Sequence, residues 1–108
     1  MGCFLCNIFK GNDINIGIEE YKNTPGAKLI DVRTREEYSS GHIPGSVNIP
    51  LQVISEVARK VSQKETPVFV YCQSGARSGQ ATDKIKKMGY TNVKNIGGMN
   101  SYKGRVEV

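Results

Sequence analysis

The sequence predicts a single α/β domain built on a mostly parallel sheet. Short apolar runs alternate with segments whose apolar residues recur at helical spacing, which is the pattern of βαβ units. One of these runs, residues 67–71, is apolar without interruption, as expected for a strand buried on both faces. The chain of 108 residues is long enough for one domain with an ordinary core, and we expect no second domain.

Five segments are predicted as strands. The clearest are residues 28–32 and 67–71, and the shorter candidates are residues 13–16, 46–49 and 93–96. Residues 23–26, between the candidates at 13–16 and 28–32, have the composition of a turn. We assign residues 13–108 to the domain and residues 1–12 to an N-terminal tail.

Helices are predicted between the strands. Thr34 and Glu37 form a capping box, and Gly41 ends that short helix. After residue 50, apolar side chains at helical spacing predict an amphipathic crossover helix: Leu51, Ile54, Val57 and Val61. The last helix begins near residue 77 and carries Ala81, Ile85 and Met88 on one face, and Gly89 stands just past its end.

The chemistry concentrates where the strand at residues 67–71 gives way to the last helix. Cys72 follows that strand, and Arg77 opens the helix. A helix N-terminus offers unpaired N–H groups and a partial positive charge, which lower a thiol pKa from about 8.5 to roughly 3.5–7.5. Gly75 gives the intervening loop backbone freedom, and Ser78 can cap the helix or support the loop. The alternative is an inert buried cysteine, but the sequence favours a reactive thiolate.

Four motifs stand in order along nearly the whole chain. Residues 72–78 read C-x-x-G-x-R-S, and the other three motifs are residues 29–33 with 36–38, residues 41–50, and residues 96–99 with Tyr102. Together they resemble the motifs of the rhodanese family of sulfurtransferases. The resemblance implies an α/β fold with a five-stranded, mostly parallel sheet flanked by helices on both faces.

The resemblance also implies an activity and a site. Sulfane sulfur would pass from thiosulfate, or a similar persulfide or polysulfide donor, to cyanide, a small thiol or a protein thiol. The route is double displacement through a persulfide on the catalytic Cys72, with no metal or organic cofactor. The loop residues would bind the transferred sulfur: Gln73, Ser74, Gly75, Ala76, Arg77 and Ser78.

Loop length separates this chemistry from related chemistries. Phosphatases and arsenate reductases of similar fold also close a cysteine loop with arginine, but with five intervening residues. Here four residues separate Cys72 from Arg77. A phosphoryl group with three charged oxygens needs the wider ring, so the shorter loop favours sulfur. A non-catalytic recognition module and a sulfur carrier that serves a partner protein remain as alternative functions.

Other charged side chains are expected to support the loop. Asp31 lies within an apolar strand, where a buried carboxylate needs partners such as Arg33 or loop amides. Arg77 either binds the anionic end of the donor or pairs with an acidic neighbour such as Asp31. We assign Asp31, Arg33 and Glu37 to structural support. His42, in a turn-like motif, is expected to be structural rather than a general base.

Charge and cysteine usage bound the partners and the compartment. Residues 1–76 carry eight basic and eight acidic side chains, whereas residues 77–108 carry seven basic and two acidic ones, so the net charge of +5 lies after the thiol. This excess is either a solvated helix face or a field that attracts sulfur anions or an acidic protein. No motif indicates a nucleic acid or metal partner. Without a long apolar run, and with an odd number of cysteines, we expect a cytoplasmic protein with no membrane contact.

The tail cysteines allow several interpretations. Cys3 and Cys6 form a C-x-x-C pair that suits a redox pair, half a zinc site or a relay that takes sulfur from Cys72. Zinc needs four ligands, and only His42 would remain once Cys72 is set aside. Incidental cysteines in a tail are the simplest interpretation.

Overall fold

The computed structural model describes residues 13–108 and contains a four-stranded parallel sheet. The strands are β1 (Lys28–Asp31), β2 (Ser46–Asn48), β3 (Val68–Cys72) and β4 (Val93–Gly98), in the spatial order β2-β1-β3-β4. All three pairings are parallel, so the carboxyl ends of the strands meet at one edge of the sheet. The α/β prediction is confirmed, although the described residues supply four strands rather than five.

The missing strand is the one predicted at residues 13–16, and that prediction is wrong. These residues begin helix α2 (Ile14–Lys22), with Asp13 as N-cap accepting a hydrogen bond from the Asn15 N–H at 3.0 Å. Ile14 and Ile16 alternate like strand residues, but Ile14 and Ile18 also match helical spacing. The two buried side chains are Ile14 and Ile18, while Ile16 is 57% exposed, so the helical period prevails.

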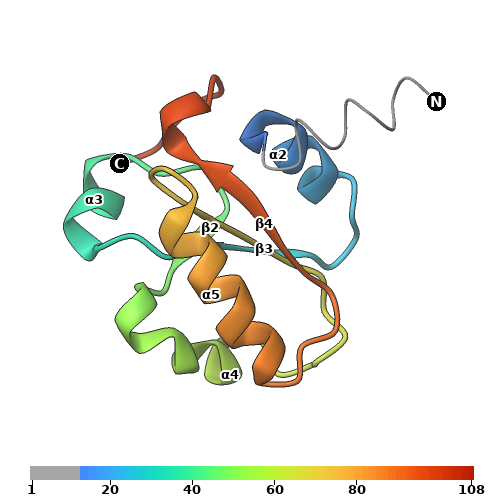
Figure 1. Ribbon diagram of the computed structural model, residues 1–108. Coiled ribbons are helices and arrows are strands. Elements are labelled where there is room, and N and C mark those ends of the chain that lie inside the picture. Colours follow the sequence, from blue (N-terminus) through green and yellow to red (C-terminus); the bar gives the residue numbers. More distant parts are fainter. Residues whose placement is uncertain (1–12) are drawn as a thin grey trace.

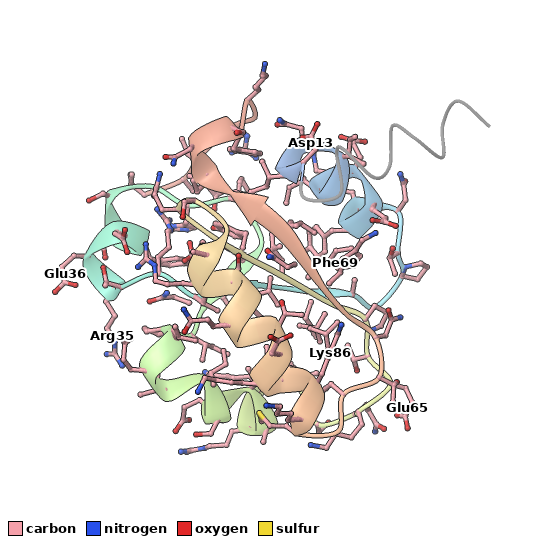
Figure 2. All side chains as sticks on the ribbon, viewed as in Figure 1. Asp13, Arg35, Glu36, Glu65, Phe69 and Lys86 are labelled. Carbon is pink, nitrogen blue, oxygen red and sulfur yellow. The ribbon has the colours of Figure 1, made fainter. Side chains whose placement is uncertain are left out.

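Helices cover both faces of the sheet, as expected (Figure 1). One face packs against α2, and Figure 2 labels Phe69 in the core between them. The other face packs against α5 (Ala76–Lys87), η1 (Leu51–Glu56) and α4 (Val57–Lys60). Every residue of β3 is buried, which confirms the prediction of a strand buried on both faces.

The crossover segment after Pro50 differs from the continuous amphipathic helix that the spacing predicts. It forms the 3-10 helix η1 followed by the four-residue helix α4, with non-helical backbone angles at Val53. Ile54, Val57 and Val61 are buried, as the spacing predicts, but Ile54 and Val57 stand three apart, a spacing that suits the tighter 3-10 geometry. Their β-branched side chains also weaken the preference for a continuous α-helix.

The other two predicted helices form as the sequence indicates. Helix α3 (Arg35–Ser40) has both hydrogen bonds of the capping box between Thr34 and Glu37, and it ends at Gly41. Helix α5 begins after Gly75 and ends at Lys87, with Met88 as C-cap and Gly89 following at a φ of 106°. No helix within residues 13–108 is both long and apolar enough to cross a membrane.

Substituting Gly17 tests how closely α2 packs on the sheet. A Cβ there would lie 2.4 Å from Cβ of Ile96 on β4, so Gly17→Ala is expected to lower the free energy of unfolding by about 1–3 kcal/mol. The matched control is Gly79→Ala in α5, where the nearest atom lies 3.5 Å away and the gain in helix propensity is about 1 kcal/mol. Urea denaturation measures both, and equal stabilisation by the two substitutions would contradict this packing.

Candidate functional site

Cys72 ends β3 at the carboxyl edge of the sheet, directly before the N-terminus of α5. The residue is fully buried, and its sulfur accepts a hydrogen bond from the Gly75 N–H at 2.9 Å. Gly75 has a φ of 106°, in the left-handed region that favours glycine, and this conformation turns its amide back toward the sulfur. The predicted placement of the thiol is therefore found.

Burial and hydrogen bonding act on the Cys72 thiol in opposite directions. Burial raises its pKa, but hydrogen bonds from the Ser78 hydroxyl and from the amides of Ser78, Gly75 and Ser74 outweigh that effect. The net result is a pKa below the ordinary value of a cysteine. The Ser78 hydroxyl lies 3.4 Å from the sulfur and is itself buried. The loop can thus stabilise a thiolate without a histidine.

The first loop residue, Gln73, is fixed by its side chain. Its amide oxygen accepts a hydrogen bond from Arg33 at 3.1 Å, and its amide nitrogen donates to Asn100 at 2.8 Å. The Gln73 carbonyl also accepts from the Asn100 N–H at 3.0 Å. A Cβ on Gly98 would lie 2.2 Å from that carbonyl, so glycine is required for this close approach. The Gln73 side chain therefore holds the loop.

The remaining loop residues face the Cys72 sulfur with backbone N–H groups rather than with side chains. Ser74 and Ala76 are exposed, and the Ser74 hydroxyl lies 3.5 Å from the Ala76 N–H. Gly75 caps α5 without a side chain, so the N-terminal amides of the helix lie beside the sulfur. Amides in this arrangement attract an anion.

Asp31 and Arg33 form a buried ion pair beneath the loop. The Arg33 Nε and Nη2 atoms donate to the Asp31 carboxylate at 2.8–3.1 Å, and the Arg33 N–H donates to it at 2.9 Å. Burial lowers the pKa of Arg33, but the Asp31 carboxylate reverses this effect and raises it overall. Arg33 thus supplies the partner predicted for Asp31, and it also donates to the Gly41 carbonyl at 2.7 Å.

Arg77 pairs with Glu37 instead of the suggested Asp31, whose carboxylate is already occupied by Arg33. Its two terminal nitrogens donate to the two Glu37 oxygens at 2.8 and 3.1 Å. The Arg77 guanidinium is the main cause that lowers the pKa of Glu37 to about 2. Both side chains are one-third exposed, so the pair joins α3 to α5 at the surface of the site.

His42 takes part in packing around α3. Its ring stacks on Tyr38 with centroids 3.7 Å apart, and its Nδ1 lies 2.8 Å from the Tyr38 carbonyl. Its backbone pairs with Glu107 near the C-terminus. These contacts match the structural role expected for it.

Two functional features were missed in the sequence. Asn100 fixes Gln73, and Asn95 on β4 lies 2.7 Å from the Ser78 hydroxyl. The Gly97-Gly98 pair was the available signal, since adjacent glycines indicate that backbone approaches closely. Across residues 13–108, no three His, Cys, Asp or Glu side chains gather as metal ligands would. The tail with Cys3 and Cys6 lies outside the described residues.

A cleft of about 600 Å³ lies beside α3. It is lined by Arg35, Tyr38, Ser39, Asn48, Ile49, Pro50, Val53, Glu56 and Lys60. Neither Cys72 nor the loop lines it, so the cleft is separate from the thiol.

Acid titration tests the Arg77–Glu37 ion pair. The folded-state pKa of Glu37 lies below its ordinary value of 4.5, so its stabilising contribution is complete above pH 4.5 and is lost as the pH falls toward 2. Glu37→Gln keeps a capping-box side chain but removes the charge, so stability should fall less steeply across this range. At pH 7 the expected loss is about 1 kcal/mol or less.

The matched control is Glu36→Gln, because Glu36 points outward from α3 (Figure 2). Chemical denaturation at a series of pH values measures all three proteins. A Glu37→Gln profile as steep as that of the unsubstituted chain would contradict the ion pair.

Known proteins resemble this chain in sequence and in structure. The sequence model of the rhodanese-like domain family matches residues 18–105, which lie inside the predicted domain. Thiosulfate sulfurtransferase PspE of Escherichia coli is 46% identical over 71 residues, which cover 65% of this chain and 68% of that protein. The uncharacterized protein YqhL of Bacillus subtilis is 38% identical over 82 residues, and the match spans 64% of its length.

The solved structure titled "rhodanese with anions from E. coli" has a TM-score of 0.71 and 39% sequence identity. The match covers 75% of this chain and 96% of that one. The family model spans most of the length of this chain, and the chain therefore belongs to the rhodanese-like domain family.

Proposed function

We propose that this chain is a sulfurtransferase that carries sulfane sulfur as a persulfide on Cys72. The observation that carries the proposal is the environment of the Cys72 sulfur, which receives the Gly75 amide at 2.9 Å and the Ser78 hydroxyl at 3.4 Å. These donors favour a thiolate, which is the nucleophilic form of cysteine. The name of the E. coli relative suggests thiosulfate as the donor.

In the first half-reaction, the thiolate attacks the outer sulfur of thiosulfate. A new S–S bond forms on Cys72, the S–S bond of the donor breaks, and its electron pair leaves with sulfite. No proton, oxidant or metal is needed for this balance. The product is a persulfide whose charge lies on the outer sulfur.

The loop amides then hold that outer sulfur. The first N–H groups of α5 have no partner within their own helix, and the helix places a partial positive charge there. A single sulfur anion needs fewer donors than a phosphoryl group, which agrees with the four residues between Cys72 and Arg77. This argues against phosphatase or arsenate chemistry.

In the second half-reaction, a thiophile removes the outer sulfur. The acceptor attacks that sulfur, the S–S bond to Cys72 breaks, and the electron pair stays on Cys72 as thiolate. Cyanide, a small thiol and a protein thiol all satisfy this step. The two half-reactions give ping-pong kinetics.

Gln73 and Arg77 support the loop in this proposal. The Gln73 side chain is engaged by Arg33 and Asn100, so only its backbone is available to the sulfur. Arg77 has two of its nitrogens on Glu37, which favours loop support over donor binding in the unliganded protein. Its positive charge still interacts with Cys72.

A second candidate is a sulfur carrier whose acceptor is another protein. The excess of basic residues after position 76 favours an acidic partner or a sulfur anion, and it requires no nucleic acid or membrane. A non-catalytic binding module is disfavoured because it would not need a thiol with a lowered pKa. A working thiolate fits a reducing compartment, so we place the protein in the cytoplasm.

Intact mass after incubation with thiosulfate tests the sulfurtransferase proposal. After removal of excess donor, the chain is expected to gain one sulfur atom, and cyanide or a thiol should discharge it. Cys72→Ser should gain none, because the attacking thiolate is absent. The Cys3→Ser/Cys6→Ser double variant is the matched control and should still gain one sulfur.

The alternatives give different results. If the double variant alone failed to discharge its sulfur, the tail cysteines would act as a relay. No gain of sulfur from thiosulfate or from any persulfide donor would contradict the proposal and favour a binding module.

A further inference from the structure

The hydroxyl of Ser78 has one proton and several acceptors within reach. The nearest is Oδ1 of Asn95 at 2.7 Å, and the Cys72 sulfur lies at 3.4 Å. The carbonyls of Gly75 and Gly97 lie at 3.0 and 3.5 Å. Because a hydroxyl donates one proton at a time, a bond to the sulfur requires that the proton leave the acceptor on Asn95.

The backbone around Asn95 fixes which end of its amide faces Ser78. The Gly97 N–H donates to Oδ1 at 3.0 Å, and Nδ2 donates to the Gly75 carbonyl at 3.3 Å. A reversed amide would place donor against donor and acceptor against acceptor. The Asn95 oxygen is therefore the nearest acceptor that competes with the sulfur for the Ser78 proton.

An irregularity in the sheet brings this side chain to the site. Val70 pairs with Asn95, but the next residue, Tyr71, pairs with Gly97, so β4 carries an extra residue at this point. Such bulges redirect side chains and occur beside active sites. Asn95 contacts Ser78, Gly75 and Gly97. It thus joins β4 to the two residues whose side chain and amide donate to the Cys72 sulfur, Ser78 and Gly75.

The charge on the Cys72 sulfur alternates during the proposed reaction. The sulfur is a thiolate before it attacks, an uncharged divalent atom within the persulfide, and a thiolate again when the acceptor removes the outer sulfur. A hydrogen bond to a charged acceptor is about twice as strong as one between neutral groups. The Ser78 hydroxyl should therefore prefer the sulfur when it is charged and Asn95 when it is not.

We propose that Asn95 is a positioning residue: its amide oxygen holds the Ser78 hydroxyl beside Cys72 and loses the hydrogen bond from that hydroxyl to the sulfur whenever the sulfur becomes a thiolate. In the second half-reaction, the S–S bond breaks with its electron pair on the Cys72 sulfur, and the hydroxyl turns toward this leaving thiolate while keeping its proton. This kinetic role rests on the proposed sulfurtransferase function. The competition for the hydroxyl does not, because it concerns thiol and thiolate alone.

Measured pKa values of Cys72 test this competition. The rate of alkylation by iodoacetamide is followed against pH in the Cys3→Ser/Cys6→Ser background, where Cys72 is the remaining cysteine. Asn95→Ala and Asn95→Asp are each measured with Ser78 present and with Ser78→Ala. Arg77, whose charge interacts with Cys72, is unchanged throughout.

The two substitutions are expected to act in opposite directions. Asn95→Ala removes the nearest competing acceptor and leaves the Gly75 carbonyl at 3.0 Å, so it should lower the pKa of Cys72 by up to about one unit, the equivalent of one net hydrogen bond. Asn95→Asp should raise it, because a carboxylate holds the hydroxyl more strongly and adds negative charge. With Ser78→Ala, the effect of Asn95→Ala should disappear and that of Asn95→Asp should shrink to its charge contribution.

A role of Asn95 in loop shape alone would give a different pattern. Shifts in the same direction from both substitutions, or an Asn95→Ala shift that persists with Ser78→Ala, would overturn the proposal. If Asn95→Ala did not fold, the Asn95→Asp pair would decide, since an equal rise with and without the hydroxyl overturns it as well. Alkylation needs no sulfur donor, so this result is independent of whether the chain transfers sulfur.

Discussion

The hydrogen bonds that reach the Cys72 sulfur are the interactions on which the rest of the site depends. A fully buried thiol has a raised pKa and little reactivity unless donors offset the loss of water. Here the Gly75 amide and the Ser78 hydroxyl supply that offset. Their positions require a loop that turns back on itself, and the turn is possible because Gly75 adopts a positive φ.

The fold holds this loop from both sides. Beneath it, the buried Asp31 carboxylate orients Arg33, which donates to Gln73 and so connects the carboxyl end of β1 to the loop. From β4, Gly98 allows close backbone contact, and Asn95 contacts the hydroxyl that serves the sulfur. At the surface, Arg77 joins α5 to α3. Ion pairs and side-chain amides therefore maintain the geometry of the loop backbone, while backbone N–H groups and the Ser78 hydroxyl stabilise the Cys72 thiolate.

Local sequence signals predicted what depends on local structure. Spacing and turn chemistry within a few residues predict the capping box of Thr34, the buried strand that leads to Cys72 and the helix that follows it. Spacing failed where two periods were compatible, as at Ile14 and Ile16, and where β-branched residues interrupt a helix, as in η1. The partners of Arg77, Gln73 and Ser78 could not be predicted, because they lie 17–40 residues away and depend on how α3 and β4 meet the loop.

The pH dependence of Cys72 alkylation tests the central claim most directly. In the Cys3→Ser/Cys6→Ser background, with Ser78 and Asn95 intact, the rate of reaction with iodoacetamide should follow a titration whose midpoint lies below the value of about 8.5 for an unperturbed thiol. That result would show that the loop donors outweigh burial. A midpoint at or above 8.5 would mean that burial dominates and would contradict the account of Cys72 as a stabilised thiolate.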